Sequence, residues 1–398
     1  MIYLLLLSLI GTLTTQSGMD IFVTLTVLTL LVQAIRKKGP EGWKLFSKMN
    51  LEAFWVFWVA VIALGFVLNG HFDGPLWKRL GEMRWILILY LMVSAYQYVR
   101  LDLEKLIKVV LAVSVIVCIG SLIVSVVKGE DRVGGILNSP MTMAHSYSLL
   151  FLTLSGIFLY RWKLLWEQER GAFYIWIASL AVVGATLVLT LTRGVWIALF
   201  FGVLAIAVAL SWRLALLIIS GTSLLIAGLF IMWPRFQERF LFAFNYQNNY
   251  DSERVVLWKT NWMIFKDHPL FGAGYGENYT LLGKYYALQG LPENQFTGHA
   301  HNQFLHMLAG TGVVGLICYL FIYFYFIWQA WSIFNSKESS PIEKAWAIGI
   351  FGALVGFAFG GLTESNFEHA KVRMMLIFIW ALLIYIKAKP TGGGRYAG

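Results

Sequence analysis

Two histidines separated by one residue, His299 and His301, are the part of the sequence best suited to acid–base chemistry. They stand directly before a long apolar run, where the chain passes from a polar to an apolar environment. The pair is a polar boundary without a role, or it binds zinc with a third ligand from His306 or Glu277, or one imidazole is a general base. We favour the base, because a neutral imidazole accepts protons near neutral pH and needs no metal.

Arg193 is the second unusual residue, since it interrupts about 40 apolar residues at a tight hairpin between two expected helices. One interpretation is a snorkelling side chain that caps the preceding helix. The other is a guanidinium that binds a phosphate or diphosphate through two parallel hydrogen bonds at a membrane surface. Arg132 lies in another short loop and is a candidate to join it.

A segment of about 70 residues, 234–302, separates two apolar runs and is far longer than the usual helix connection of about 2–8 residues. Ordered loops of this length commonly carry function. Within it, Ser252 is expected to N-cap an interfacial helix that ends at Asp267 and presents Arg254 among aromatic residues. The glycine-rich stretch 269–276 then either cradles a phosphate or forms a tight turn packed on a helix.

The composition places these residues in a membrane protein. The 398 residues are 59% hydrophobic and 13% charged, with a mean hydropathy of +0.69. Because soluble domains carry about 25% charged residues, this composition excludes a cytosolic enzyme, a disordered chain and a secreted disulfide scaffold. Cys118 and Cys318 lie inside apolar runs and are expected in the core. The net charge of +10 is then a topology signal rather than a sign of nucleic-acid binding.

A helix of about 20 apolar residues crosses the bilayer core. Twelve segments are candidates: 2–13, 18–35, 51–69, 83–99, 106–127, 144–160, 172–191, 195–211, 214–233, 303–331, 345–361 and 373–387. None alternates as a membrane β-barrel strand does. The sequence therefore predicts an all-α polytopic membrane helical bundle with about 12 transmembrane helices, forming one integral membrane domain over 1–398. The 234–302 loop joins the ninth and tenth helices, and its interfacial helices are expected to cover the active site.

The distribution of charge predicts the orientation. Seventeen of the 31 Lys and Arg residues fall in one alternating set of loops and ends, which the positive-inside rule assigns to the cytoplasm. Both termini are then cytoplasmic and the long loop lies outside. All seven histidines fall on or near the outer side: His71, His145, His268, His299, His301, His306 and His369. No charged residue lies near the middle of an expected helix and no internal repeat is visible, which disfavours an ion-coupled transporter.

These features indicate an anionic, lipid-linked donor with arginines on its phosphates, and a base that activates an acceptor hydroxyl. A lipid diphosphate is a good leaving group once its charge is neutralised. Neither a metal nor a general acid is required, and no cofactor is expected.

His301-Asn302, nine residues and then Gly312 resemble the His-Asn-x9-Gly pattern of bacterial O-antigen ligases. The superfamily that joins these ligases with O-antigen polymerases has further motifs that the chain resembles: Thr192-Arg193-Gly194, Arg254 with Trp258, and residues 269–274. The resemblance covers about residues 187–315, and the twelve-span layout with a large outer loop is similar over the whole chain.

The resemblance implies a GT-C-like, metal-independent glycosyltransferase in the bacterial inner membrane. Such an enzyme transfers O-antigen polysaccharide from undecaprenyl diphosphate to lipid A–core on the periplasmic face. The resemblance also implies that His301 deprotonates the acceptor hydroxyl, with inversion at the anomeric carbon, and that Arg193 and Arg254 bind the donor diphosphate. No nucleic-acid partner is expected.

Arg132, His299 and Asn302 are additional candidates for the site. Many polymerases carry Arg-x10-Gly or Arg-x15-Gly stretches. A glycine at either offset is missing after each of Arg132, Arg193, Arg235, Arg239 and Arg254, which favours a ligase. A polymerase that extends the lipid-linked glycan stays the alternative. A ligase that attaches glycans to protein and a non-enzymatic transporter of lipid or polysaccharide are further alternatives.

Overall fold

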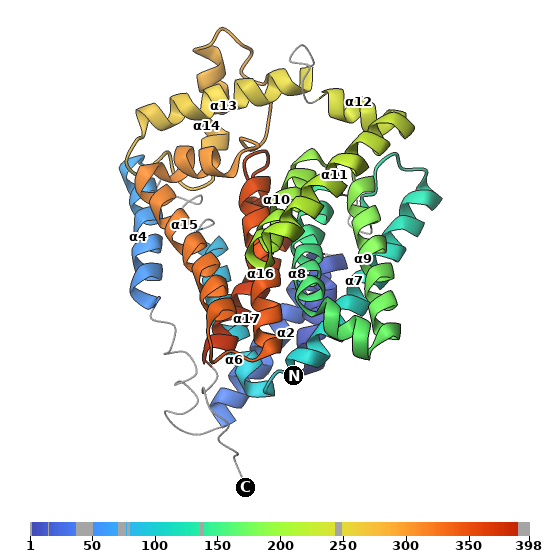
Figure 1. Cartoon of the computed structure of the whole chain (residues 1–398). Helices are drawn as coiled ribbons and strands as arrows, with labels where there is room; N and C mark the ends of the chain where they lie inside the picture. The colour runs from blue at the N-terminus through green and yellow to red at the C-terminus, as the bar shows by residue number, and fades with distance from the viewer. Residues whose placement is uncertain are drawn as a thin grey trace.

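The computed structural model describes residues 2–14, 16–36, 51–70, 77, 80–135, 139–242 and 249–388, which form a helical bundle with a separate layer at one end (Figure 1). Each of the twelve expected segments is helical: α1 (Ile2–Thr14), α2 (Gln16–Arg36), α4 (Glu52–Leu68), α6 (Arg84–Val99), α7 (Leu103–Lys128), α8 (Pro140–Gln168), α9 (Arg170–Leu189), α10 (Arg193–Leu210), α11 (Trp212–Met232), α15 (Gln303–Asn335), α16 (Pro341–Gly360) and α17 (Ala370–Ala388).

Within the described residues, seven helices are long and apolar enough to cross a membrane, namely α7, α8, α9, α10, α11, α15 and α16. The chain is therefore a multi-pass membrane protein with an all-α fold, as predicted, while the number of twelve crossings stays a prediction. Several residues behind the predicted orientation lie outside the described residues: Lys37, Lys38, Lys44, Lys48, His71, Lys389 and Arg395. The predicted outer face likewise stays a prediction.

Helix α11 shows why the composition is so apolar. Only 6% of the apolar 18-residue stretch of this helix is buried in the protein. Large side chains such as Leu217, Leu224 and Ile231 are exposed along it. Exposed apolar area costs about 25 cal/mol per Å² in water, so a face of this kind is stable only where lipid tails cover it.

Helices α8, α10 and α16 pack closely against one another through glycines. A Cβ added to Gly156 of α8 would overlap the backbone of Gly349 of α16. One turn further along α16, a Cβ on Gly352 would overlap Ile206 of α10. Helices in lipid associate largely through such close packing of small residues. Helices α10 and α16 are antiparallel, so the start of α10 lies beside the end of α16.

Helices α12 (Pro234–Phe242), α13 (Asn249–Asp267) and α14 (Asn278–Ala287) form the layer at one end of the bundle, which we call the outer layer. Figure 1 shows α13 running across the bundle helices rather than along them. Buried side chains of α13, including Leu257 and Ile264, pack with α14 in a small apolar cluster of their own. The 234–302 segment thus contains helices, as predicted.

The start of α13 differs from the prediction. The helix ends at Asp267 as expected, but it begins at Asn249. Ser252 therefore lies inside the first turn and is not the N-cap. Asn249 and Asp251 are also residue types that favour helix starts, so the sequence offered several starts within four residues.

Helix α15 is broken at Gly312, whose φ of 65° lies in the left-handed region. The stretch 269–274 of the outer layer supplies hydrogen-bond partners to the backbone groups that the break leaves unpaired. Four hydrogen bonds run from a backbone N–H to a carbonyl oxygen: Ala273 to Ala309 at 2.9 Å, Gly274 to Gly310 at 3.0 Å, Val313 to Pro269 at 2.9 Å and Val314 to Leu270 at 3.2 Å.

The glycine-rich stretch is therefore a tight turn packed on a helix, the second of its two interpretations. A Cβ on Gly272 would overlap the backbone of Gly310, so only glycine allows this approach. The N–H groups of Ala273 and Gly274 are engaged with α15 and do not face a ligand. The final glycine of the His-Asn-x9-Gly pattern is Gly312, and it marks the break.

We predict that Gly312→Ala destabilises the protein strongly. A Cβ at this position would overlap the backbone of Leu270, and the positive φ is unfavourable for alanine. The expected loss is about 3 kcal/mol or more, seen as a lower melting temperature or loss of folded protein in detergent.

Gly221→Ala on α11 is the matched control. No atom lies within 4 Å of a Cβ built at Gly221. Alanine is preferred to glycine in a helix by about 1 kcal/mol, so this variant should be as stable as the wild type or slightly more stable. Equal stability of the two variants would contradict the role assigned to the break.

Candidate active site

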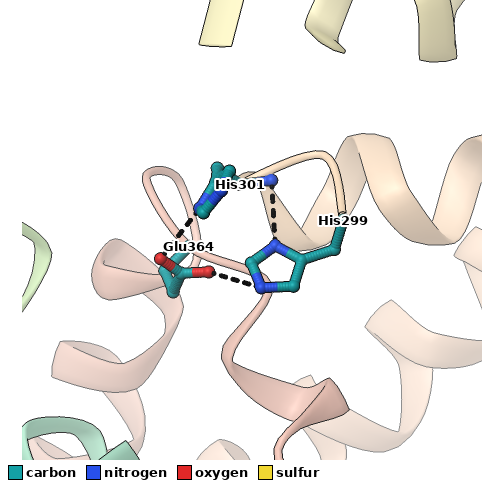
Figure 2. Close-up of side chains that lie close together, drawn as sticks. All are labelled: His299, His301 and Glu364. Atoms are coloured by element: carbon teal, nitrogen blue, oxygen red, sulfur yellow. Dashed lines mark hydrogen bonds and ion pairs between the residues drawn. The ribbon is translucent and has the colours of Figure 1, made fainter. Parts of the chain in front are cut away.

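His301, His299 and Glu364 form a compact polar cluster at the outer end of the bundle (Figure 2). The Nδ1 atom of His301 lies 3.0 Å from one carboxylate oxygen of Glu364, and Nε2 of His299 lies 3.1 Å from the other. The backbone N–H of His301 donates to Nδ1 of His299 at 3.3 Å. The Glu364 side chain is 3% exposed, so both histidines meet a carboxylate that water barely reaches.

Asn302 fixes the place of His301. Its side-chain oxygen accepts from the N–H of Leu305 at 3.0 Å and so caps α15. Its amide nitrogen donates to the carbonyl of Leu362 at 3.1 Å, which ties the start of α15 to the loop that carries Glu364. His301 has a φ of 47°, a conformation uncommon for residues other than glycine. These contacts hold it against the carboxylate.

The cluster holds a defined charge state. Burial lowers the pKa of His299 to about 3, so this imidazole is neutral. Burial alone would raise the pKa of Glu364, but the hydrogen bond from His301 and the adjacent His299 lower it well below its usual range. The N–H of Ser365 also donates to this carboxylate at 3.1 Å. Glu364 is therefore an ionised acceptor.

The ionised carboxylate selects the tautomer of His301. An imidazole that donates Nδ1–H to a carboxylate presents an unprotonated Nε2, which is the proton-accepting form. His299 takes the opposite tautomer, because its Nδ1 accepts from backbone and its Nε2 faces the carboxylate. The geometry thus suits His301 as a base and His299 as a positioning residue.

The three predicted arginines lie in one cavity. Its volume is about 290 Å³, and its charged lining residues are Arg132, Arg193, Arg254 and Glu364. These residues come from the loop before α8, the start of α10, α13 and the loop after α16. Guanidinium groups gathered in one cavity suit a phosphate or diphosphate. Since Glu364 also holds His301, the cavity and the histidine cluster adjoin.

Local contacts explain why Arg193 lies beside Glu364. Arg193 begins α10 after a tight turn, and the Cβ of any other residue at Gly194 would overlap the hydroxyl of Thr363. Arg132 secures the same turn, because its Nε donates to the carbonyl of Thr190 at 2.9 Å. The Thr-Arg-Gly motif therefore places a guanidinium next to the loop after α16.

Two residues of this site were not among the predicted site residues. Glu364 stands just after the apolar run 345–361, and its signal was a single carboxylate at the outer end of an expected helix. His145 lines the arginine cavity from α8. In the sequence it is only one of seven histidines on the expected outer side, and no motif marks it.

The cluster also has the composition of a metal site. The ligand atoms of His299, His301 and Glu364 lie within 4.8 Å of one another. Two histidines and a glutamate are a known zinc-binding set. His306, one expected third ligand, instead has its Nδ1 3.0 Å from the side-chain nitrogen of Asn278 and its Nε2 3.6 Å from Glu368. Glu277, the other, is not a member of this group.

Comparison with known proteins agrees with the motifs. A family model described as O-Antigen ligase matches residues 176–320. The segment holds Arg193, Arg254 and His301, while Arg132 and Glu364 lie outside it. The chain is also 25% identical over 183 residues to the teichuronic acid biosynthesis protein TuaE of Bacillus subtilis strain 168. That match covers 44% of this chain and 35% of the relative, so the chain spans about a third of the relative's length.

The matched segment contains the hairpin of Arg193, the α13 helix, the glycine-rich turn and the break in α15, and these elements build most of the site. Over residues 176–320 this multi-pass membrane protein is similar to the O-antigen ligase family, and the resemblance seen in its motifs is confirmed.

Proposed function

We propose that this protein is an O-antigen ligase that transfers a polysaccharide from undecaprenyl diphosphate to a hydroxyl of lipid A–core. The observation that carries the proposal is the shared position of Glu364. Its carboxylate orients His301 and also lines the cavity of the three arginines. A base and an anion site are therefore neighbours, as transfer from a lipid diphosphate requires.

The reaction needs one proton transfer and one displacement. Nε2 of His301 takes the proton of the acceptor hydroxyl, and the hydroxyl oxygen attacks the anomeric carbon of the donor sugar. The bond from that carbon to the diphosphate oxygen breaks with inversion, and undecaprenyl diphosphate leaves with the electron pair. Arg193 and Arg254, with Arg132 beside them, stabilise the charge that grows on the diphosphate. No step requires a metal.

The proposed location follows from topology. The site lies with α12, α13 and α14 at one end of the bundle, and the positive-inside rule assigns the opposite loops to the cytoplasm. We place the protein in the bacterial inner membrane with both termini inside and the active site in the periplasm. Donor and acceptor then both reach the site from the lipid phase.

Polymerisation is the second candidate function. It uses the same base and the same diphosphate site, with a second lipid-linked glycan as the acceptor. The similarity to a protein named for teichuronic acid biosynthesis favours keeping this candidate, because that name points to a polysaccharide other than O-antigen. Only the acceptor distinguishes the two reactions.

The decisive experiment supplies purified protein with lipid-linked O-antigen and rough lipopolysaccharide, with and without a chelator. The proposal predicts glycan joined to lipid A–core at the same rate in both conditions. A lengthened lipid-linked glycan instead means a polymerase. Activity lost with the chelator and restored by zinc would assign His299, His301 and Glu364 to a metal site. Absence of any glycan transfer, with ion-coupled flux of substrate, would support a transporter.

His301→Ala should abolish transfer while the protein stays folded. Removal of a general base costs about 100-fold to 10,000-fold in rate. The measurement is initial rate of product formation, with the melting temperature as a check on folding. His268→Ala, which removes a histidine of the same long loop outside the cluster, is the control and should keep the wild-type rate. Full activity of His301→Ala would refute the assignment of the base.

Arg193→Ala and Arg254→Ala should each lower kcat/KM for the donor about 100-fold or more, because each removes charge stabilisation at the leaving group. Steady-state kinetics with varied donor concentration measure this. Arg235→Ala is the control. Arg235 is 62% exposed, forms an ion pair with Asp131 at 2.9 Å and is not among the residues that line the cavity. Unchanged donor kinetics in both cavity variants would leave these arginines a topological role alone.

The protein should lose stability in acid through its histidine cluster. The ordinary pKa of histidine is 6.5, and that of His299 is lowered to about 3, so between these values the unfolded chain binds a proton that the folded chain does not. Stability therefore falls as pH falls through this window. The lowered pKa of Glu364 acts in the same direction below the usual range of a carboxyl group.

The measurement is the melting temperature at pH 7 and at pH 4.5 for the wild type and His299→Gln. Glutamine keeps an N–H donor for Glu364 but does not titrate, so the variant should show the smaller decrease on acidification. An equal decrease in the two proteins would show that His299 does not bind its proton in this way.

A further inference from the structure

His145 is a buried polar residue of the cavity that the proposed mechanism does not use. It lies on α8 and is 1% exposed. Its Nε2 atom is buried and has no hydrogen-bond partner among the described residues. Buried polar atoms in folded proteins are almost always paired, and an unpaired one at a polar cavity marks the place of a missing partner. The same cavity is lined by Arg132, Arg193 and Arg254.

We propose that His145 binds the donor, with Nε2–H donating a hydrogen bond to a phosphate oxygen of the lipid diphosphate. This inference rests on the proposed function, because it names a further contact for the same donor. The partner is an anion since the other polar groups of the lining are mainly guanidinium groups and hydroxyls. A diphosphate offers more oxygens than two or three arginines saturate, and a hydrogen bond to a charged oxygen is a strong one.

His145 lies on a rigid part of the bundle and can therefore hold its N–H group in a fixed position. Helix α8 is the most buried of the seven candidate spans, because 78% of its apolar 18-residue stretch lies inside the protein. Its glycine contact with α16 at Gly156 sets its distance from the loop that carries Glu364. His145 therefore extends from a rigid wall, while Arg254 extends from the outer layer. The histidine defines where the phosphate sits and the arginines neutralise its charge.

The alternative contact for Nε2 of His145 is a hydroxyl group of the donor's glycan instead of its diphosphate. The sugar-free carrier, undecaprenyl diphosphate, separates these two contacts because it has the phosphates without the glycan. Undecaprenyl monophosphate is the companion probe, since it lacks the second phosphate. Loss of affinity for the sugar-free diphosphate is thus specific to the contact proposed here.

The test measures the Kd of undecaprenyl diphosphate for the full-length protein in lipid nanodiscs. His145→Met removes the imidazole N–H but keeps a side chain of similar size, and it should raise the Kd about tenfold. His145→Gln keeps an N–H near the Nε2 position and should stay within about threefold of the wild type. Thr153→Val is the matched control on the same helix. It removes a buried hydroxyl that bonds only within α8 to Leu149, and it should leave the Kd unchanged.

The outcomes separate this inference from the proposed function. If the wild type does not bind undecaprenyl diphosphate, the donor assignment itself fails. If the wild type binds and Arg193→Ala weakens binding, but His145→Met binds as tightly as the wild type, the function stands and the His145 contact is refuted.

A spectroscopic measurement covers the case in which His145→Met does not fold. In protein labelled with ¹⁵N-histidine, the Nε2 resonance of His145 is identified by its absence from His145→Gln. Addition of undecaprenyl diphosphate to the wild type should shift this resonance. A resonance that does not move while the probe binds would overturn the proposal.

Discussion

A carboxylate that is 3% exposed persists at the end of a membrane bundle only because donors reach both of its oxygens. Glu364 accepts from His301 on one oxygen, and from the backbone of Ser365 on the other, which also faces His299. Because the carboxylate stays ionised, the tautomers of both imidazoles are fixed. Because Glu364 also lines the arginine cavity, the relative position of base and anion site depends on this one side chain.

The rest of the fold brings together the separate segments that surround that carboxylate. Close glycine packing of α10 against α16 brings the Arg193 turn to the loop of Glu364. The break at Gly312 lets the turn 269–274 join α15 through backbone hydrogen bonds, and this seats the outer layer on the bundle. Motifs that lie far apart in the sequence are therefore brought together by the packing of these helices and turns.

Long-range packing limited what could be predicted from the sequence. The helices were predictable because a run of about 20 apolar residues has one stable form in a bilayer. Arg193 and His301 stood out as candidates because each interrupts or borders such a run, and Arg254 stood out because it lies among aromatic residues on an expected interfacial helix. Glu364 was not, because its partner His301 lies 63 residues away and no spacing rule connects them.

Two local features were not decided by the sequence, for different reasons. Whether the N–H groups of 269–276 face a ligand or a helix depends on α15, some 40 residues further on, so the sequence left both interpretations open. The start of α13 was misplaced because several neighbouring residues are equally good helix starters. Local patterns thus predicted which residues are candidates for the site, and tertiary contacts decided what each one touches.

The break in α15 has a consequence for how the base is assembled. The residues before Gly312 are bonded to the outer layer, whereas Glu364 follows a bundle helix. His301 and its carboxylate thus lie on two segments that are joined by hydrogen bonds from Asn302 to Leu362 and between Gln303 and the residues Gly361 and Phe367. Any movement of the start of α15 relative to the loop after α16 would break these bonds and part the imidazole from its carboxylate. In the proposed reaction, the proton-accepting tautomer of His301 thus depends on the seating of α15 against the loop after α16.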